Sequence, residues 1–99
     1  MTLTGDWDVR IKTPIGSLEV RYTFTEHDGV LRGSAAGKHE TVTLSDIVVD
    51  GEHVTWRQSI TKPMRLHLEF DVHFDGDRFA GHSRAGRLPR SAVCGVRRG

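Results

Sequence analysis

The sequence predicts an all-β protein, an eight-stranded antiparallel up-and-down meander closed into a small barrel. Apolar and polar residues alternate along short segments, which is the period of a strand with one buried face. Turn-forming residues separate the segments, and connections of about two to six residues are too short for parallel crossovers. Pairing the first strand with the eighth removes two exposed edges, so we favour closure over the alternative, a two-sheet β-sandwich. The 99 residues predict one domain, residues 1–99.

The first three segments carry the clearest alternation. A break at residues 13–16 separates the first from the second, because Pro14 lacks the ladder donor and Gly16 accepts turn dihedrals. Asp28 and Gly29 predict the next hairpin turn. The residues expected to face the core are Trp7, Val9 and Ile11, then Leu18, Val20, Tyr22 and Phe24, then Leu31, Gly33 and Ala35.

The fourth segment changes parity in its middle. Val42 and Leu44 point to one face, whereas Ile47 and Val49 have the opposite parity. A β-bulge near residues 45–46 would bring all four side chains to the core face. Because a bulge bends its strand, this irregularity favours a barrel over a flat sheet.

Two glycine-containing turns predict how the later segments pair. A two-residue loop at Gly51 and Glu52 sets Val49 opposite Val54, Ile47 opposite Trp56, and Asp46 opposite Arg57. A two-residue loop at Gly76 and Asp77 sets Phe74 opposite Phe79, Asp71 opposite His82, and Glu69 opposite Arg84. Apolar residues meet apolar ones and acids meet bases, which is the consistency expected of a correct register. The last three strands are expected over residues 64–74, 78–84 and 91–98.

Gly5, Asp6 and Trp7 stand at the start of the first segment, and two arginines stand at the end of the last. This arrangement resembles the calycin group, which comprises lipocalins, fatty-acid-binding proteins and avidin-like barrels. In many of those proteins a Gly-x-Trp motif begins the first strand, and a basic residue near the last strand packs over the tryptophan. The resemblance implies an up-and-down barrel with structural roles for Gly5, Trp7 and a C-terminal arginine, Arg97 or Arg98.

Basic residues gather at the C-terminal end of the sequence. The net charge is +1, but all 13 acidic residues precede residue 78, and the charged residues from there to the end are arginines. Clustered positive charge attracts anions, so we expect an anion-binding patch at Arg84, Arg87 and Arg90. The alternative is that these arginines pair with acids on neighbouring strands. Nucleic-acid binding is not expected.

The sequence lacks the signatures of nucleotide-dependent and nucleophilic chemistry. It contains no Walker loop, no Gly-x-Gly-x-x-Gly and no Gly-x-Ser-x-Gly, so we expect no cofactor. The histidines are spread over turns and outer strand faces. His73 and His82 are expected to lie diagonal to one another, without an evident third ligand at metal distance. We therefore expect no metal site.

Neither a membrane span nor a secretory signal is predicted. No apolar run approaches the roughly 20 residues of a membrane-spanning helix, and residues 1–6 lack the basic start and apolar stretch of a signal. The lone Cys94 cannot form an internal disulfide, and we expect it to be a small buried filler. The expected location is the cytoplasm.

The expected barrel interior is rich in aromatic residues, and this leads to the main functional hypothesis. An eight-stranded barrel is just wide enough to be filled by side chains or to hold one small ligand. We expect a cytoplasmic module that binds a small apolar or aromatic molecule, although the sequence leaves open whether the interior is filled. The residues expected to contact the ligand are Tyr22, Phe24, Trp56, Gln58 and Phe70.

Two alternatives come from other functional classes. One is a cofactor-free enzyme of the cyclase or isomerase type that acts on an apolar substrate, in which Tyr22 serves as the acid or as a polarising donor and catalysis comes mostly from orientation. The other is an interaction protein that uses the basic patch to bind a polyanion or an acidic protein, with salt-sensitive affinity. The sequence leaves the oligomeric state open, and a homodimer is among the alternatives.

Overall fold

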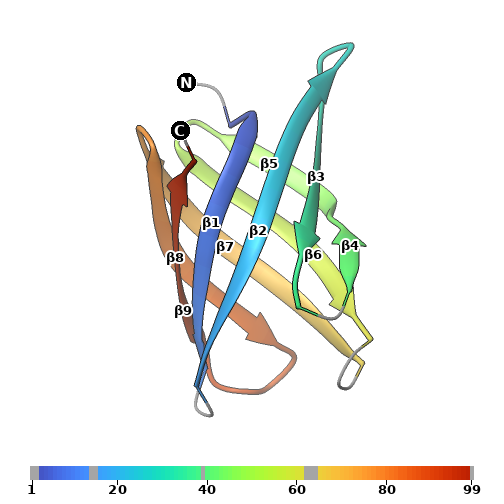
Figure 1. The fold of residues 1–99 in the computed structure, drawn as a ribbon, viewed down its shortest axis with the longest axis vertical. Coiled ribbons are helices and arrows are strands. Elements are labelled where there is room, and N and C mark those ends of the chain that lie inside the picture. Colours follow the sequence, from blue (N-terminus) through green and yellow to red (C-terminus); the bar gives the residue numbers. More distant parts are fainter. Residues whose placement is uncertain (1–2, 14–15, 39, 62–64, 99) are drawn as a thin grey trace.

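The computed structural model describes residues 3–13, 16–38, 40–61 and 65–98, and it confirms an all-β barrel (Figure 1). No helix in these described ranges is long and apolar enough to cross a membrane. The strands are β1 (Gly5–Thr13), β2 (Gly16–His27), β3 (Val30–Ala36), β4 (Thr41–Thr43), β5 (Ser45–Asp50), β6 (His53–Ile60), β7 (Leu66–Asp75), β8 (Arg78–Ala85) and β9 (Ser91–Arg97).

The nine strands form one antiparallel sheet whose two edge strands are neighbours in the chain. Their order is β4-β3-β2-β1-β9-β8-β7-β6-β5, so the first strand pairs with the last, as the closed meander predicts. Only Leu44 separates the edge strands β4 and β5. Residues 41–50 therefore pair with β3 at their beginning and with β6 at their end, and the barrel is nearly closed.

Residues 41–50, predicted as one strand, are two strands in the structure, which raises the count from eight to nine. The bulge predicted near residues 45–46 is confirmed, because the register shifts between Ser45 and Val48 and Asp46 has a φ of 52°. The extra residue places Ser45 opposite Arg57. The predicted pairing of Asp46 with Arg57 is therefore wrong in register, although their side chains still approach to 4.0 Å.

The β7–β8 hairpin has the register that its turn predicts. The pairs are Phe74 with Phe79, Asp71 with His82, and Glu69 with Arg84. Val49 also pairs with Val54, as predicted for β5 and β6. Strand β7 begins at Leu66, and the predicted earlier start at Met64 lies outside the described residues, as do the turn residues 14–15.

Aromatic side chains fill the centre of the barrel. Each is at most 2% exposed, and each has another aromatic ring with its centroid 4.8 to 6.3 Å away. Offset and edge-on contacts at such distances stabilise aromatic pairs beyond the burial of their surface. These side chains are Trp7, Tyr22, Phe24, Trp56, Phe70, Phe74 and Phe79.

Three residues expected in the core are exposed instead. Leu18 is 53% exposed and Val49 is 51% exposed, because each lies near the end of its strand at the rim of the barrel. Cys94 is exposed because it alternates with the buried Val93 and Gly95 along β9 and therefore points outward. The expectation that Cys94 is a buried filler is wrong.

Strand β1 begins and β9 ends at the upper end of the barrel in Figure 1, and there Arg97 lies over Trp7. The Arg97 guanidinium carbon is 4.4 Å from the centroid of the Trp7 ring, a cation–π distance. The same guanidinium donates hydrogen bonds to the Thr4 carbonyl and, at 2.9 Å, to the Asp77 carboxylate. Trp7 Nε1 donates to the Leu3 carbonyl at 3.0 Å. The buried indole and the arginine above it are thus both hydrogen-bonded.

The position of Arg97 also helps to explain why residue 5 is a glycine. Gly5 has a φ of +126°, which side-chain-bearing residues rarely adopt, and a Cβ there would lie 3.1 Å from Arg97 Nη1. Arg98 points elsewhere and pairs with Asp8 at 3.5 Å. The arginine that lies over the tryptophan is therefore Arg97, and the molecule has the general shape of a calycin barrel.

Candidate functional site

One glutamine oxygen accepts two buried hydrogen bonds inside the barrel. Gln58 Oε1 accepts from the Tyr22 hydroxyl at 2.7 Å and from Trp56 Nε1 at 3.1 Å, which links β2 to β6 across the interior. Burial raises the pKa of Tyr22 far above its usual range, and the hydrogen bonds with Gln58 and Trp56 offset only part of this effect. Tyr22 therefore stays protonated, with its hydroxyl directed at Gln58.

The structure brings the expected ligand-contacting residues together as a packed cluster. Trp56 stacks on Phe70 with ring centroids 5.0 Å apart and an angle of 8° between the planes. Tyr22 and Phe24 lie 5.6 and 5.7 Å from the Trp56 ring. These side chains contact one another in the middle of the barrel, and Gln58 is bonded to two of them. They form a packed layer inside the barrel.

Below this layer, the inward side chains of β2, β6 and β7 become more exposed toward the lower end of the barrel, where β1 ends and β2 begins and where β6 ends and β7 begins. Along β2, Tyr22 is fully buried, Val20 is half-buried and Leu18 is 53% exposed. The same trend runs from Gln58 to Ile60 on β6 and from Phe70 to Leu66 on β7. We call the partly exposed inward residues of this end the lower rim: Leu18, Val20, Ile60, Leu66 and Leu68.

A groove of about 640 Å³ crosses the outer face of the sheet from β5 to β8. Its lining mixes both charges, and Arg57 lies 3.6 Å from Glu69. An adjoining groove of about 350 Å³ shares Arg57 and Glu69 with it. The charged side chains and the histidine that line the larger groove are Asp46, Arg57, Glu69, Asp71, His82, Arg84 and Arg90.

The expected anion-binding arginines do not form one patch free of acids. Arg84 and Arg90 line the groove that also holds three carboxylates. Arg84 Nε donates to the Leu88 carbonyl at 3.2 Å, and Arg84 stands opposite Glu69 in the sheet. Arg87 is exposed on the turn after β8. Positive charge at this end is thus distributed among acidic neighbours.

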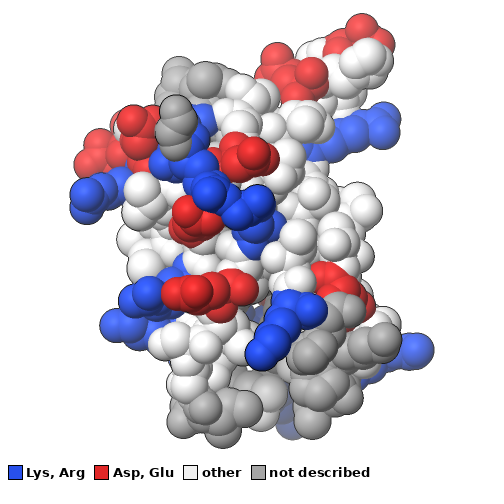
Figure 2. Space-filling view, viewed as in Figure 1, with Lys and Arg blue, Asp and Glu red and all other residues white. Residues whose placement is uncertain are grey.

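Acidic and basic side chains also alternate on the face formed by β1, β2 and β9 (Figure 2). Arg10 pairs with Glu19 at 3.0 Å between β1 and β2, and Arg98 pairs with Asp8 at 3.5 Å. Exposed pairs of this kind contribute about 0–1 kcal/mol each. Because these charges alternate, the described residues of this face carry no large patch of a single charge sign.

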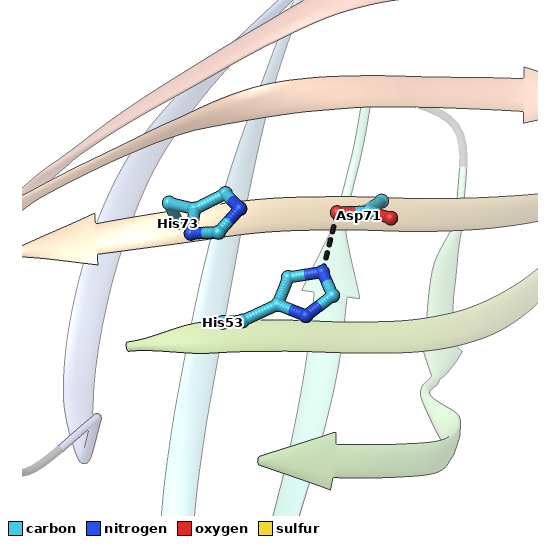
Figure 3. Close-up of side chains that lie close together, drawn as sticks. All are labelled: His53, Asp71 and His73. Atoms are coloured by element: carbon cyan, nitrogen blue, oxygen red, sulfur yellow. Dashed lines mark hydrogen bonds and ion pairs between the residues drawn. The ribbon is translucent and has the colours of Figure 1, made fainter. Parts of the chain in front are cut away.

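A cluster of histidines and an acid that the sequence analysis missed lies on the outer wall. His53, Asp71 and His73 meet there (Figure 3). The sequence places His53 in or beside a turn, and in the structure it is the first residue of β6 and pairs with His73 of β7. The β6–β7 register would have revealed this pair. It was not predicted, because the connection between the two strands contains no two-residue turn signal.

Comparison with protein-family models, with curated proteins and with solved structures gives no match. The function is therefore inferred from the side chains that the barrel brings together.

Proposed function

We propose that the chain is a small-molecule-binding barrel that takes an apolar or aromatic ligand at its lower rim. The observation that carries the proposal is the apolar surface that the lower rim leaves open. Arg97 covers Trp7 at the upper end, where the described inward side chain left largely exposed is Val49, whereas at the lower end Leu18 and the four partly exposed residues around it keep apolar surface open to solvent. Removing such surface from water is favourable by about 25 cal/mol per Å². A ligand seated at the rim would gain its affinity mainly from this burial.

The packed aromatic layer would be the floor of such a site. Gln58 lies between Trp56 and Ile60 on the inward face of β6, at the boundary between the layer and the rim. Both of its interior hydrogen bonds use the carbonyl oxygen. Its amide nitrogen takes part in neither bond, and we infer that it orients a polar atom of an otherwise apolar ligand. Ligand pockets characteristically combine apolar walls with a few polar groups.

The general shape of the molecule points the same way. The calycin group, which the chain resembles, includes fatty-acid-binding proteins, and Arg97 lies over Trp7 as that resemblance implies. Because the aromatic layer fills the middle of the barrel, the ligand would enter only part of the way. We therefore infer a small or slender ligand.

The proposal does not extend to catalysis or to polyanion binding. Tyr22, the acid or polarising donor of the enzyme hypothesis, is fully buried, and its hydroxyl donates to Gln58. Arg84 and Arg90 share their groove with Glu69 and two further carboxylates. The buried Tyr22 therefore does not favour catalysis, and the carboxylates beside Arg84 and Arg90 do not favour polyanion binding.

Two matched lysine substitutions test the lower rim. Leu18 at the rim and Val48 on β5 are 53% and 58% exposed, so neither Leu18→Lys nor Val48→Lys should unfold the protein. A panel of apolar and aromatic probes is titrated into ¹⁵N-labelled protein and followed by NMR. We expect saturable shifts at Val20 and Ile60, with affinity lowered by Leu18→Lys and unchanged by Val48→Lys.

Native mass spectrometry of protein purified from its own host provides an independent check. A co-purified small molecule that Leu18→Lys loses and Val48→Lys retains would support the lower-rim site. Equal retention of ligand by both variants, or shifts confined to the outer wall, would contradict it.

A further inference from the structure

Two histidines and an aspartate converge on the outer wall of the barrel (Figure 3). His53 and His73 are paired directly across β6 and β7, and their rings stack with centroids 4.7 Å apart and planes 16° apart. Asp71 precedes His73 by two positions on the same face of β7, and its Oδ1 lies 2.7 Å from His53 Nε2. One ligand atom from each residue lies within 4.8 Å of the other two. Three side chains able to bind metal thus share one small patch.

We propose that His53, Asp71 and His73 bind a divalent transition-metal ion, for which Zn²⁺ is the best match. Imidazole nitrogen and carboxylate oxygen bind Zn²⁺ at about 2.0–2.2 Å, and a tetrahedral ion holds its ligand atoms roughly 3.3 Å apart. The present separations of up to 4.8 Å would have to shorten modestly. Two nitrogen ligands favour transition metals over Mg²⁺ and Ca²⁺, which prefer oxygen.

The side chains can make this adjustment without disturbing the core. The His53 and Asp71 side chains are 38% and 43% exposed, and His73 is exposed. Their side-chain torsion angles can therefore change without displacing buried groups. The backbone beneath them is fixed, because the next pair of the β6–β7 ladder is Val54 with Val72 and both valines are fully buried. A rigid strand pair therefore carries three adjustable ligands.

An ion would use lone pairs that the cluster leaves unshared. The hydrogen bond between His53 and Asp71 engages one of the two rings. Among the described residues, the His73 ring stacks on His53, and the His73 side chain makes no hydrogen bond or ion pair. A divalent ion would bind a nitrogen of each ring and a carboxylate oxygen, and water would complete its coordination. This site lies on the outer wall beside the β5–β6 turn, and it is independent of the proposed lower-rim ligand.

Zinc titration of protein made without a histidine tag tests the site. The protein is treated with EDTA and titrated with Zn²⁺ by calorimetry, and Co²⁺ absorption gives a second readout. We expect one ion per chain and an affinity at least about tenfold lower in His73→Gln and in Asp71→Asn. His67→Gln is the matched control, because His67 is an exposed histidine on the same face of β7. Its affinity for zinc should equal that of the unchanged protein.

Asp71→Asn retains an amide that can still hydrogen-bond the His53 ring, and His73→Gln changes an exposed side chain, so both variants should fold. Far-UV circular dichroism verifies this. No saturable binding at millimolar zinc would overturn the proposal. Unchanged affinity in His73→Gln would also overturn it, and so would a loss in His67→Gln equal to that in His73→Gln.

Discussion

Replacing Gln58 by methionine should destabilise the protein more than replacing Tyr22 by phenylalanine. The Gln58 carbonyl oxygen accepts from Tyr22 at 2.7 Å and from Trp56 at 3.1 Å, and both donors are buried. Gln58→Met keeps the length of the side chain but removes the oxygen that accepts from both donors. Tyr22→Phe removes one donor and leaves the Trp56 hydrogen bond in place.

The expected magnitudes follow from this asymmetry. A buried donor left without a partner costs about 1–3 kcal/mol, so Gln58→Met should lower the free energy of unfolding by roughly 2–6 kcal/mol. Loss of one neutral hydrogen bond in Tyr22→Phe should cost about 0.5–1.5 kcal/mol. The double variant should lose less than the sum of the two, because removing the Tyr22 hydroxyl also removes one of the two orphaned donors.

Urea unfolding followed by tryptophan fluorescence measures all four stabilities, since Trp7 and Trp56 are both buried in the folded protein. Circular dichroism on the same samples checks that unfolding is two-state. A Gln58→Met variant as stable as Tyr22→Phe would refute the reasoning that one oxygen satisfies both donors. Strictly additive losses in the double variant would refute it as well.

Two further predictions concern Tyr22 and Gly81. Burial raises the pKa of Tyr22, the single tyrosine, above its unfolded value of about 10. The free energy of unfolding should therefore be unaffected by Tyr22 ionisation below about pH 10, and above that pH it should fall by up to about 1.4 kcal/mol per pH unit. Tyrosinate absorbance that appears before the protein unfolds would contradict this prediction. Gly81→Ala should cost about 3 kcal/mol or more, because its Cβ would lie 2.0 Å from the Asp71 carbonyl oxygen and 2.6 Å from Val72 Cα. Thermal unfolding measures this loss against Gly37→Ala, whose Cβ would have its nearest contact at 3.7 Å and which should change stability little.

Local patterns in the amino-acid sequence predict most of the strands and several of their pairings. The period of two along Val20, Tyr22 and Phe24 identifies an inward face, because successive strand residues point to opposite sides. The short turn at Gly76 and Asp77 sets the β7–β8 register, because a two-residue loop leaves one antiparallel alignment. Both features depend only on residues close together in the chain.

Which side chains meet at each candidate site depends on contacts between residues far apart in the chain. Alternation directs Tyr22 and Gln58 inward, but their hydrogen bond forms because barrel curvature brings β2 and β6 face to face. His53 meets His73 only through the β6–β7 register, which no short turn specifies. Strand periodicity gives the side of the sheet on which a residue lies. Its partner across the barrel is set by strand tilt, closure and packing, which involve the whole chain at once.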